Sequence, residues 1–343
     1  MRYLIIVGPD KNKVIMKLNK SFPIKIINIL KLIVSVITSL SFFCANSHAA
    51  MPNIVCESIC PNVPTQFHSS QPFPSGAHCV QLDQNRIYYR TLGDGNPTIV
   101  FSSGTGFPSD GWYQAGIANK MANKVRVFSY DRIFTFNSCL NPNNYMPITA
   151  KDVVTQLRQL LKKENIKPPY ILVGHSFGGL YMLLYAKEFP NEVAGLVLMD
   201  ATSDAGPTPL PQEAEKILQK LGNPQNPAPE NPLYNEMIGQ LPSYLQMKNA
   251  PPLPKDMPLI VMYATKHCLP KTWTKKLMCM TPSQEAAHKK GQFEIYKMSR
   301  IHRIIAMDGD HMSFFNQDKN QIVLNALNSI LTMAQPRLVN LSN

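Results

Sequence analysis

Residues 170–179 decide the fold, because they place a reactive side chain between a strand and a helix. They read Tyr170-Ile171-Leu172-Val173-Gly174-His175-Ser176-Phe177-Gly178-Gly179. The first four residues are apolar and predict a short buried strand, and residues 177–188 predict a helix. Glycine stands two residues before and two residues after Ser176, in the G-x-S-x-G pattern of a tight turn that lifts a serine hydroxyl above the sheet edge. We therefore expect Ser176 to be a nucleophile.

Strand patterns alternate with helical patterns on either side of this turn. We expect strands over 87–92, 97–101, 125–130, 170–173, 193–199, 258–263 and 303–307, and helices over 112–121, 150–164, 177–188, 212–221 and 321–333. This alternation predicts an α/β fold, a mostly parallel sheet with helices on both faces. Residues 203–257 break it, and we interpret them as a small cap inserted between strands 193–199 and 258–263.

Residues 1–49 are predicted to be a secretory signal peptide. Lysines precede an apolar run over 32–44, 13 residues without charge, which ends at small residues near Ala49 and Ala50. This order is typical of a cleaved leader, and the run is short for a membrane span of about 20 residues. Both Met1 and Met16 fit as its start. We expect a secreted or periplasmic protein with no stable membrane span after processing.

Export changes what the cysteines mean. The chain beyond the leader retains Cys56, Cys60, Cys79, Cys139, Cys268 and Cys279. An even number in an oxidising compartment predicts disulfides, and we expect Cys268 to pair with Cys279. No Cys/His pair at finger spacing follows Cys56 and Cys60, so neither a metal nor a cofactor is expected. We interpret residues 50–85 as an irregular Cys/Pro-rich arm and residues 86–343 as the main domain.

Composition excludes several classes of protein. The 44% of hydrophobic residues can bury a core, which excludes disorder. The net charge of +12 is carried half by residues 1–49, and the rest is spread thinly along the chain. Nucleic-acid binding needs clustered cations, so no nucleic-acid partner is expected.

Three segments together resemble the α/β-hydrolase fold family. They are residues 168–179 with the G-x-S-x-G turn, residues 193–200 ending in Asp200, and residues 308–311, which read Asp-Gly-Asp-His. Their order matches the family's nucleophile, acid and histidine. The resemblance covers about residues 85–335 and includes Tyr130-Asp131-Arg132. There the chain departs from the family, because Ile133-Phe134-Thr135 replaces the usual glycine-containing turn.

The resemblance implies a catalytic triad. A serine needs a base, and His311 stands a few residues after the last predicted strand, where the family places it. In many members of the family the acid follows the strand after the cap, but here strand 258–263 runs into residues without a carboxylate. Other members place the acid at the end of the preceding strand, where Asp200 stands, so Asp200 is the expected acid. Capping of the next turn is its alternative role, and Asp204 is the fallback. We expect His175 to point away from Ser176, with a place in the lining of the pocket as its alternative role. The remaining histidines are expected to be superficial or structural: His68, His78, His267, His288 and His302.

The resemblance also implies an oxyanion hole of two backbone amides. One is the N–H of Phe177, directly after the nucleophile. The other should come from the loop over 102–107, where Ser103 replaces the family's histidine and Thr105 becomes the expected donor. Trp112 is expected to anchor this loop by packing.

These features predict an exported serine hydrolase that cleaves an ester, thioester or amide through an acyl-enzyme. A carboxylic ester is our first expectation, and the partner is a small-molecule acyl substrate. Leucine and methionine in the cap favour an apolar group, although the same residues could simply be core. An acyltransferase and a non-catalytic binding protein of the same fold remain alternatives, because fold alone does not determine function.

Overall fold

The computed structural model describes residues 6–7, 14–15, 74–83, 85–133, 138, 148–203, 236, 239–266 and 282–342. The chain divides into two units, Met1–Met51 and Pro52–Asn343. In the first unit, β1 (Ile6–Val7) pairs antiparallel with β2 (Val14–Ile15). The apolar run and the cleavage site of the predicted leader lie outside the described residues. None of the helices within these ranges is long and apolar enough to cross a membrane.

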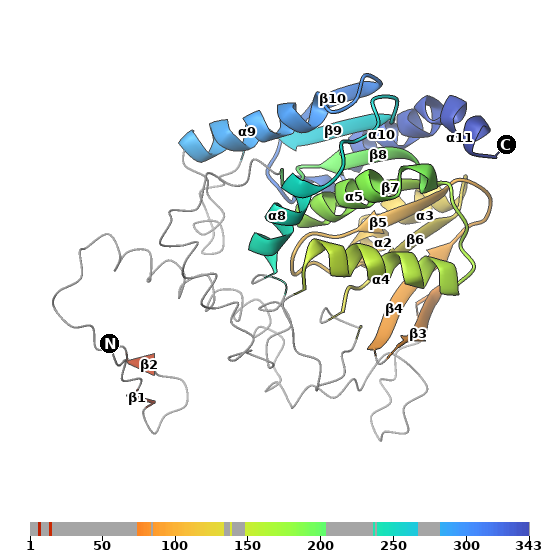
Figure 1. The fold of residues 1–343 in the computed structure, drawn as a ribbon, viewed down its shortest axis with the longest axis horizontal. Coiled ribbons are helices and arrows are strands. Elements are labelled where there is room, and N and C mark those ends of the chain that lie inside the picture. Colours follow the sequence, from red (N-terminus) through yellow and green to blue (C-terminus); the bar gives the residue numbers. More distant parts are fainter. Residues whose placement is uncertain are drawn as a thin grey trace. The chain divides into compact units, whose positions relative to one another are not determined.

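The second unit is built on an eight-stranded sheet (Figure 1). Its strands are β3 (Ala77–Leu82), β4 (Asn85–Leu92), β5 (Thr98–Ser102), β6 (Val127–Tyr130), β7 (Tyr170–His175), β8 (Val193–Met199), β9 (Leu259–Ala264) and β10 (His302–Met307). They lie in the order β10-β9-β8-β7-β5-β6-β4-β3. Neighbours from β10 to β6 run parallel, whereas β4 is antiparallel to both β6 and β3. The predicted mostly parallel sheet is confirmed.

The edge strand β3 differs from expectation, because it lies within residues 50–85, which we interpreted as irregular. It pairs with β4 in a register from Ala77 opposite Arg90 to Leu82 opposite Asn85. Only its two end residues are buried, as expected of an edge strand, so it has no apolar run that would reveal it in the sequence. Cys79 in β3 is disulfide-bonded, and the predicted pair Cys268–Cys279 lies outside the described residues.

Helices flank the parallel strands. They are α2 (Gly111–Gln114), α3 (Ile117–Ala122), α4 (Ala150–Lys163), α5 (Phe177–Glu188), α8 (Gln240–Asn249), α9 (Pro282–Tyr296), α10 (Asn320–Met333) and α11 (Gln335–Ser342), with short 3₁₀ turns η1 (Pro190–Glu192) and η3 (Ser313–Phe315). The single helix expected over 112–121 is two helices, because Gly116 between them has φ 74° and a left-handed residue ends a helix. The helix expected over 212–221 lies outside the described residues.

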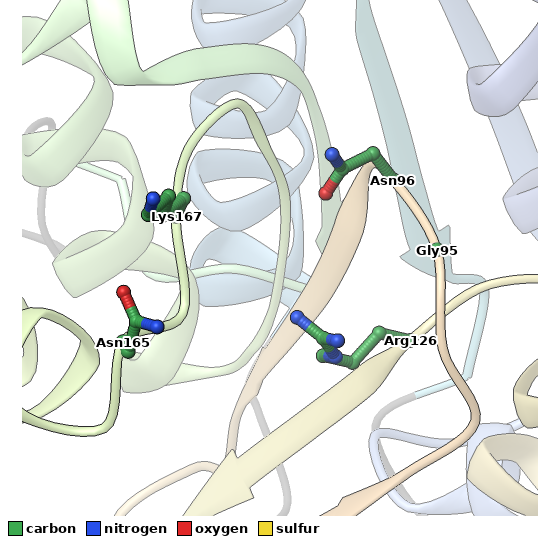
Figure 2. Close-up of a pocket in the computed structure, with 5 residues that line it drawn as sticks. All are labelled: Gly95, Asn96, Arg126, Asn165 and Lys167. Carbon is green, nitrogen blue, oxygen red and sulfur yellow. The ribbon is translucent and has the colours of Figure 1, made fainter.

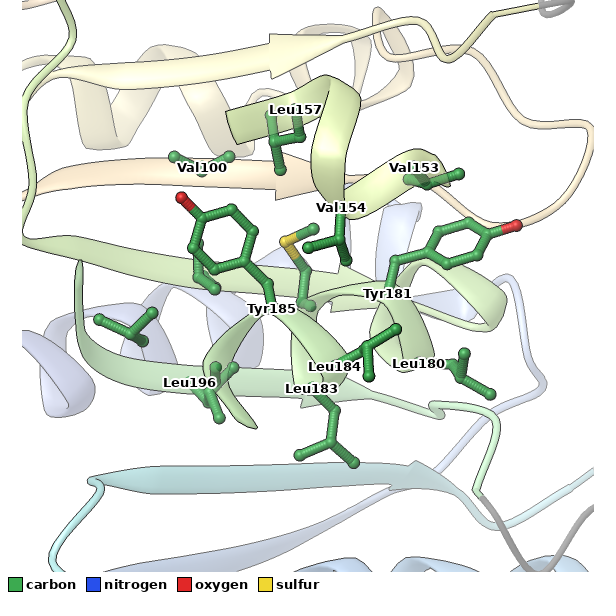
Figure 3. Close-up of a cluster of buried hydrophobic side chains, with 14 of the residues drawn as sticks. Val100, Val153, Val154, Leu157, Leu180, Tyr181, Leu183, Leu184, Tyr185 and Leu196 are labelled. Carbon is green, nitrogen blue, oxygen red and sulfur yellow. The ribbon is translucent and has the colours of Figure 1, made fainter. Parts of the chain in front are cut away.

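Two hydrophobic cores lie on opposite faces of the sheet. In the first, α4 and α5 pack over the central strands (Figure 3), and residues such as Val154, Leu184 and Leu196 are fully buried. The second lies under α2, α3 and α10. Strand β5 serves both, since Val100 enters the first core while Ile99 and Phe101 enter the second, as the two-residue period of a strand requires. The predicted helices on both faces are therefore confirmed.

The described part of the predicted cap packs on this body. The N–H of Ala150, at the start of α4, donates to the Ser243 hydroxyl of α8 at 2.8 Å. Met247 and Met257, two of the methionines in the predicted cap, are fully buried in the first core. Leu245 of α8 is 56% exposed. Most of these apolar residues therefore stabilise the fold itself.

Candidate active site

Ser176 occupies a strained corner between β7 and α5. It follows His175, the last residue of β7, precedes Phe177, the first residue of α5, and has φ 55° and ψ −127°. Residues other than glycine rarely adopt a positive φ, and such outliers concentrate at functional sites where the surroundings hold them. The N–H of Ser176 donates to Met199 O at 3.0 Å, and its carbonyl accepts the N–H of Thr202 at 3.0 Å. These bonds tie the serine to the end of β8.

Glycine is required where backbone segments meet at this corner. A Cβ atom at Gly174 would lie 2.6 Å from Gly178 O, and a Cβ atom at Gly178 would lie 2.4 Å from Ser102 O. A side chain at either position would push backbone apart, which only glycine avoids. The two glycines therefore let α5 begin directly against β7 and the loop after β5.

A hydrogen bond joins Asp200, which follows β8, to His311, which follows β10. Nδ1 of His311 lies 2.6 Å from Oδ2 of Asp200. An ionised carboxylate can only accept, so Nδ1 carries the proton and Nε2 keeps a lone pair that can take up another. The Asp200 side chain has no exposed surface, whereas 23% of the His311 side chain is exposed. The pair thus has a buried carboxylate behind a partly open imidazole.

The second carboxylate oxygen of Asp200 is also occupied. Oδ1 accepts the N–H of Ala264 at 2.9 Å and lies 2.8 Å from Nε2 of His288 on α9. We expected His288 to be superficial or structural, but it contacts the same carboxylate as His311. Asp200 itself has φ 46°, a second positive value beside that of Ser176.

His175 connects the segment that carries His311 to the corner that carries Ser176. Its Nε2 lies 2.8 Å from the carbonyl oxygen of His311, and the two ring centroids are 4.4 Å apart. His175 therefore contacts the segment that carries His311, which fits its alternative role in the lining of the pocket. In the part of the chain that the structure describes, no hydrogen bond joins the Ser176 hydroxyl to His311. Such bonds are often long in unliganded enzymes and tighten when substrate binds.

His175 is held in its neutral form. It is 1% exposed, and burial, followed by the nearby His311, lowers its pKa from 6.5 to about 3. Because a carbonyl oxygen can only accept, Nε2 must carry the single ring proton and donate it to His311 O. Nδ1 is buried and has no hydrogen-bond partner among the residues that the structure describes. His175 therefore fixes the backbone of His311 without adding a charge beside it.

The amides predicted for the oxyanion hole flank this corner. Phe177 is the first residue of α5, where backbone N–H groups have no partner within the helix. Gly104 precedes Thr105 and lies against the nucleophile, since a Cβ atom there would be 3.4 Å from Ser176 Oγ. The Thr105 hydroxyl accepts a hydrogen bond from Gln240 of α8 at 3.3 Å. The loop after β5 thus lies beside Ser176.

A buried arginine holds this loop. Arg132, 2% exposed, donates to Ser103 O at 2.8 Å and to Gly104 O at 2.9 Å. It also pairs with Glu236 at 2.8 Å. Burial by itself lowers the pKa of the guanidinium, but the Glu236 carboxylate opposes this and the pKa is raised above its usual value. A permanent charge therefore fixes two consecutive carbonyls of the loop.

Trp112 and Asp131 anchor the same loop. The indole N–H of Trp112 donates to Ser103 Oγ at 3.0 Å, so the expected packing anchor also forms a hydrogen bond. The N–H of Ser109 donates to Oδ1 of Asp131 at 2.8 Å. Only the family resemblance pointed to Asp131 and Arg132 in the sequence. Their hydrogen bonds show that both residues hold the loop after β5 in place.

The two carboxylates that precede His311 in the sequence have other partners. Asp310 accepts bonds from the N–H of Met312 at 3.0 Å and the hydroxyl of Ser313 at 2.9 Å. Asp308 is 77% exposed and pairs with Lys266 at 2.6 Å. The fallback Asp204 lies outside the described residues. Within those ranges, no group of three or more His, Cys, Asp or Glu is arranged to hold a metal ion.

A separate pocket lies at the amino ends of the central strands β5, β6 and β7 (Figure 2). Its lining residues are Gly95, Asn96, Arg126, Asn165 and Lys167. They precede β5, β6 and β7, whereas Ser176, Asp200 and His311 follow the carboxyl ends of their strands. Ligands of parallel α/β sheets bind at the carboxyl ends of the strands, so this pocket is distinct from the candidate active site.

The sequence did not reveal the residues that hold the catalytic side chains and the loop after β5 in place. It did not predict α9 or the contacts of His288, Glu236 and Arg132. A weak signal existed for α9, because residues 282–296 contain several good helix formers, but Gly291 lies inside that run. For Glu236, no local pattern in the sequence marks a residue that pairs with a distant arginine.

Comparison with known proteins agrees with this geometry. The model of the alpha/beta hydrolase family matches residues 99–319. The chain is 33% identical over 126 residues to the uncharacterized protein YqjL of Bacillus subtilis, which covers 36% of this chain and 48% of that protein. It is 28% identical over 155 residues to a 2-hydroxy-6-oxononadienedioate/2-hydroxy-6-oxononatrienedioate hydrolase of a Pseudomonas species, covering 42% and 50%.

A solved structure shares the fold at low identity. The enol-lactonase from Burkholderia xenovorans superposes with a TM-score of 0.50 at 16% identity, covering 74% of this chain and 99% of that one. The chain spans half or less of the length of the two curated relatives described above. The family match nevertheless includes the Ser176 corner, Asp200 and His311 and extends over more than half of the chain. The chain therefore belongs to the alpha/beta hydrolase family.

Proposed function

We propose that the protein is a serine hydrolase that cleaves an ester, thioester or amide, with a carboxylic ester as the preferred substrate. One observation carries the proposal. Ser176, in a strained corner, lies next in sequence to a histidine that contacts His311, and His311 is hydrogen-bonded to the buried Asp200 at 2.6 Å. Family membership and a relative named as a hydrolase support hydrolysis.

The proposed reaction uses these side chains in two steps. The Ser176 oxygen attacks the substrate carbonyl while Nε2 of His311 takes the hydroxyl proton, and Asp200 stabilises the resulting imidazolium. The tetrahedral intermediate expels the alcohol, thiol or amine, which receives that proton, and an acyl-enzyme remains. Water then attacks the acyl-enzyme with His311 as base, which releases the acid and restores Ser176.

The oxyanion of each tetrahedral intermediate would be stabilised by the N–H groups of Phe177 and Thr105. Both belong to segments held next to Ser176, one by α5 and the other by the loop that Arg132 and Trp112 anchor. Losing one such donor typically removes about 2.7–4 kcal/mol of transition-state stabilisation. An apolar acyl group remains part of the proposal, motivated by the leucine and methionine content of the cap.

Export belongs to the proposal as well. Residues 1–49 have the order of a signal peptide, so the mature chain should begin near Ala50 and be secreted or periplasmic. The six remaining cysteines should form disulfides there. Intact-mass analysis of the protein from the cell envelope or medium tests the cleavage, and alkylation without reductant should find few free thiols. An uncleaved leader on the active protein would contradict it.

A fluorophosphonate probe tests the chemistry without knowledge of the substrate. The activated serine should label, and peptide mapping should place the adduct on Ser176. Labelling accompanied by hydrolysis of a short p-nitrophenyl ester supports the hydrolase. Faster acyl transfer to an added alcohol than to water would instead indicate an acyltransferase. Failure to label would contradict the proposal and favour a binding protein.

A further inference from the structure

Asp200 binds two imidazoles at once. Nδ1 of His311 lies 2.6 Å from Oδ2, and Nε2 of His288 lies 2.8 Å from Oδ1. Because an ionised carboxylate is only an acceptor, both nitrogens must donate. Oδ1 also accepts the N–H of Ala264 at 2.9 Å. Two donors on Oδ1 leave Oδ2 as the oxygen for His311.

The backbone at Asp200 needs such support. The residue has φ 46°, which a side chain other than glycine adopts only when surrounding structure imposes it. Its carboxylate could turn about two side-chain bonds, and a turn of either would carry Oδ2 away from His311. Donors on Oδ1 from two different elements, β9 and α9, resist this rotation.

Helix α9 presents one face to the segment that carries Asp200. His288, Gly291 and Gln292 stand at positions i, i+3 and i+4, which share a helix face. Gln292 Nε2 donates to Ala201 O at 2.6 Å. A Cβ atom at Gly291 would lie 2.2 Å from the hydroxyl oxygen of Ser203. Glycine at 291 thus permits the close approach that brings His288 to the carboxylate.

We propose that His288 is a positioning residue of the active site. Its Nε2–H holds Oδ1 of Asp200 and so directs Oδ2 toward His311, while Gly291 and Gln292 dock α9 on the same turn. His288 touches neither substrate nor Ser176 in this scheme and acts through Asp200. The inference rests on the proposed hydrolase function and adds a residue to that same site.

Two substitutions separate positioning from packing. His288→Gln keeps an N–H donor that reaches Oδ1. His288→Leu removes the donor and fills the same space with an apolar side chain of similar size. We expect His288→Leu to lower kcat and the rate of fluorophosphonate labelling by about 10- to 100-fold, because small misplacements of a catalytic group cost that much. The KM should change less than about threefold, since the substrate is not contacted. His288→Gln should recover most of the loss.

His302→Leu is the matched control. The His302 ring packs on Tyr296 at the end of α9, with centroids 3.8 Å apart, and its Nδ1 bonds Ser299 O at 2.6 Å. This variant removes a histidine that packs on the end of α9 and leaves the contacts of His288, Gly291 and Gln292 with the Asp200 segment in place, so kcat should stay near the wild-type value. Equal losses in His302→Leu and His288→Leu, or a His288→Gln variant as slow as His288→Leu, would overturn the proposal.

Proton NMR of the full chain provides a readout that does not need turnover. The Nδ1 proton of His311, in a short bond to a carboxylate, should give a resonance far downfield in the wild type and in His288→Gln. It should broaden or vanish in His288→Leu. An unchanged resonance in folded His288→Leu would contradict the positioning role. If the wild type neither labels nor hydrolyses esters, the proposed function fails, and this resonance still decides the role of His288.

Discussion

The serine side and the acid side of the candidate site are built in different ways. Ser176 is held within one stretch of chain, where β7, a turn between glycines and α5 follow one another. Asp200 and His311 are 111 residues apart, and their contact depends on β8, β9, β10 and α9 being in place. The difference teaches that a nucleophile can be specified locally while its acid is specified by packing. Substitutions on the two sides should therefore fail in different ways.

The largest loss of activity is expected for substitution of Ser176, the residue that is held within one stretch of chain. Ser176→Ala removes the nucleophile and nothing that holds the corner, because the corner's hydrogen bonds come from backbone groups. We expect labelling to disappear and ester hydrolysis to fall by on the order of 10⁴–10⁶-fold with an unchanged melting temperature. Ser329→Ala on α10 is the matched control. Residual turnover near the wild-type rate would refute the mechanism.

The next largest loss of activity is expected for substitution of the acid, Asp200. Asp200→Asn leaves an amide that cannot stabilise the imidazolium and favours the wrong tautomer of His311, so kcat should fall up to about 10⁴-fold. Asp308→Asn, an exposed carboxylate paired with Lys266, should change kcat little. Steady-state kinetics on a p-nitrophenyl ester measures both. A mild Asp200→Asn variant would mean that another carboxylate serves the histidine.

The loop after β5 offers a third comparison, because Arg132 both balances Glu236 and holds two carbonyls. Arg132→Met should destabilise the fold by about 3–5 kcal/mol, since it leaves a buried carboxylate unpaired. Adding Glu236→Leu removes that charge and should restore most of the stability. Denaturant unfolding measures this step.

Activity should separate from stability in the same pair of variants. The double variant still lacks the donors to Ser103 O and Gly104 O, so kcat should remain about 10- to 100-fold low because the loop is misplaced. If kcat recovers together with stability, the arginine serves the fold alone.

The smallest effect concerns pH. Burial lowers the pKa of His175 from 6.5 to about 3. Between these values the unfolded chain binds a proton that the folded chain does not, so this residue makes stability fall as pH decreases through that window. His175→Gln removes the titration and keeps an N–H donor for the His311 carbonyl. Its unfolding free energy should depend less steeply on pH, by up to about 1.4 kcal/mol per pH unit.

Urea unfolding at several pH values from 6.5 to 3 measures the two slopes. Carboxylates contribute to both proteins alike, so the difference between the slopes isolates His175. Parallel curves for wild type and His175→Gln would show that His175 is protonated inside the fold, in contradiction to its burial.

Much of the fold follows from period and composition. The apolar runs at β7 and β8 and the helical spacing in α4 are strong signals, because each reflects burial of nearby residues on one or both faces. β3 and α9 lack such signals. The first is a half-exposed edge strand, and the second combines a glycine with a weakly amphipathic pattern.

The site divides in the same way. The sequence by itself determined that Ser176 stands in a tight corner, because glycine spacing and strand–turn–helix order are properties of neighbouring residues. Only the tertiary structure decided that His288 shares Asp200 with His311, that His175 donates to the His311 carbonyl, and that Arg132 holds the loop after β5. These contacts join residues that are far apart along the chain. Their strength depends on burial and on where a carboxylate or carbonyl oxygen points, which follows from how strands and helices pack and not from local pattern.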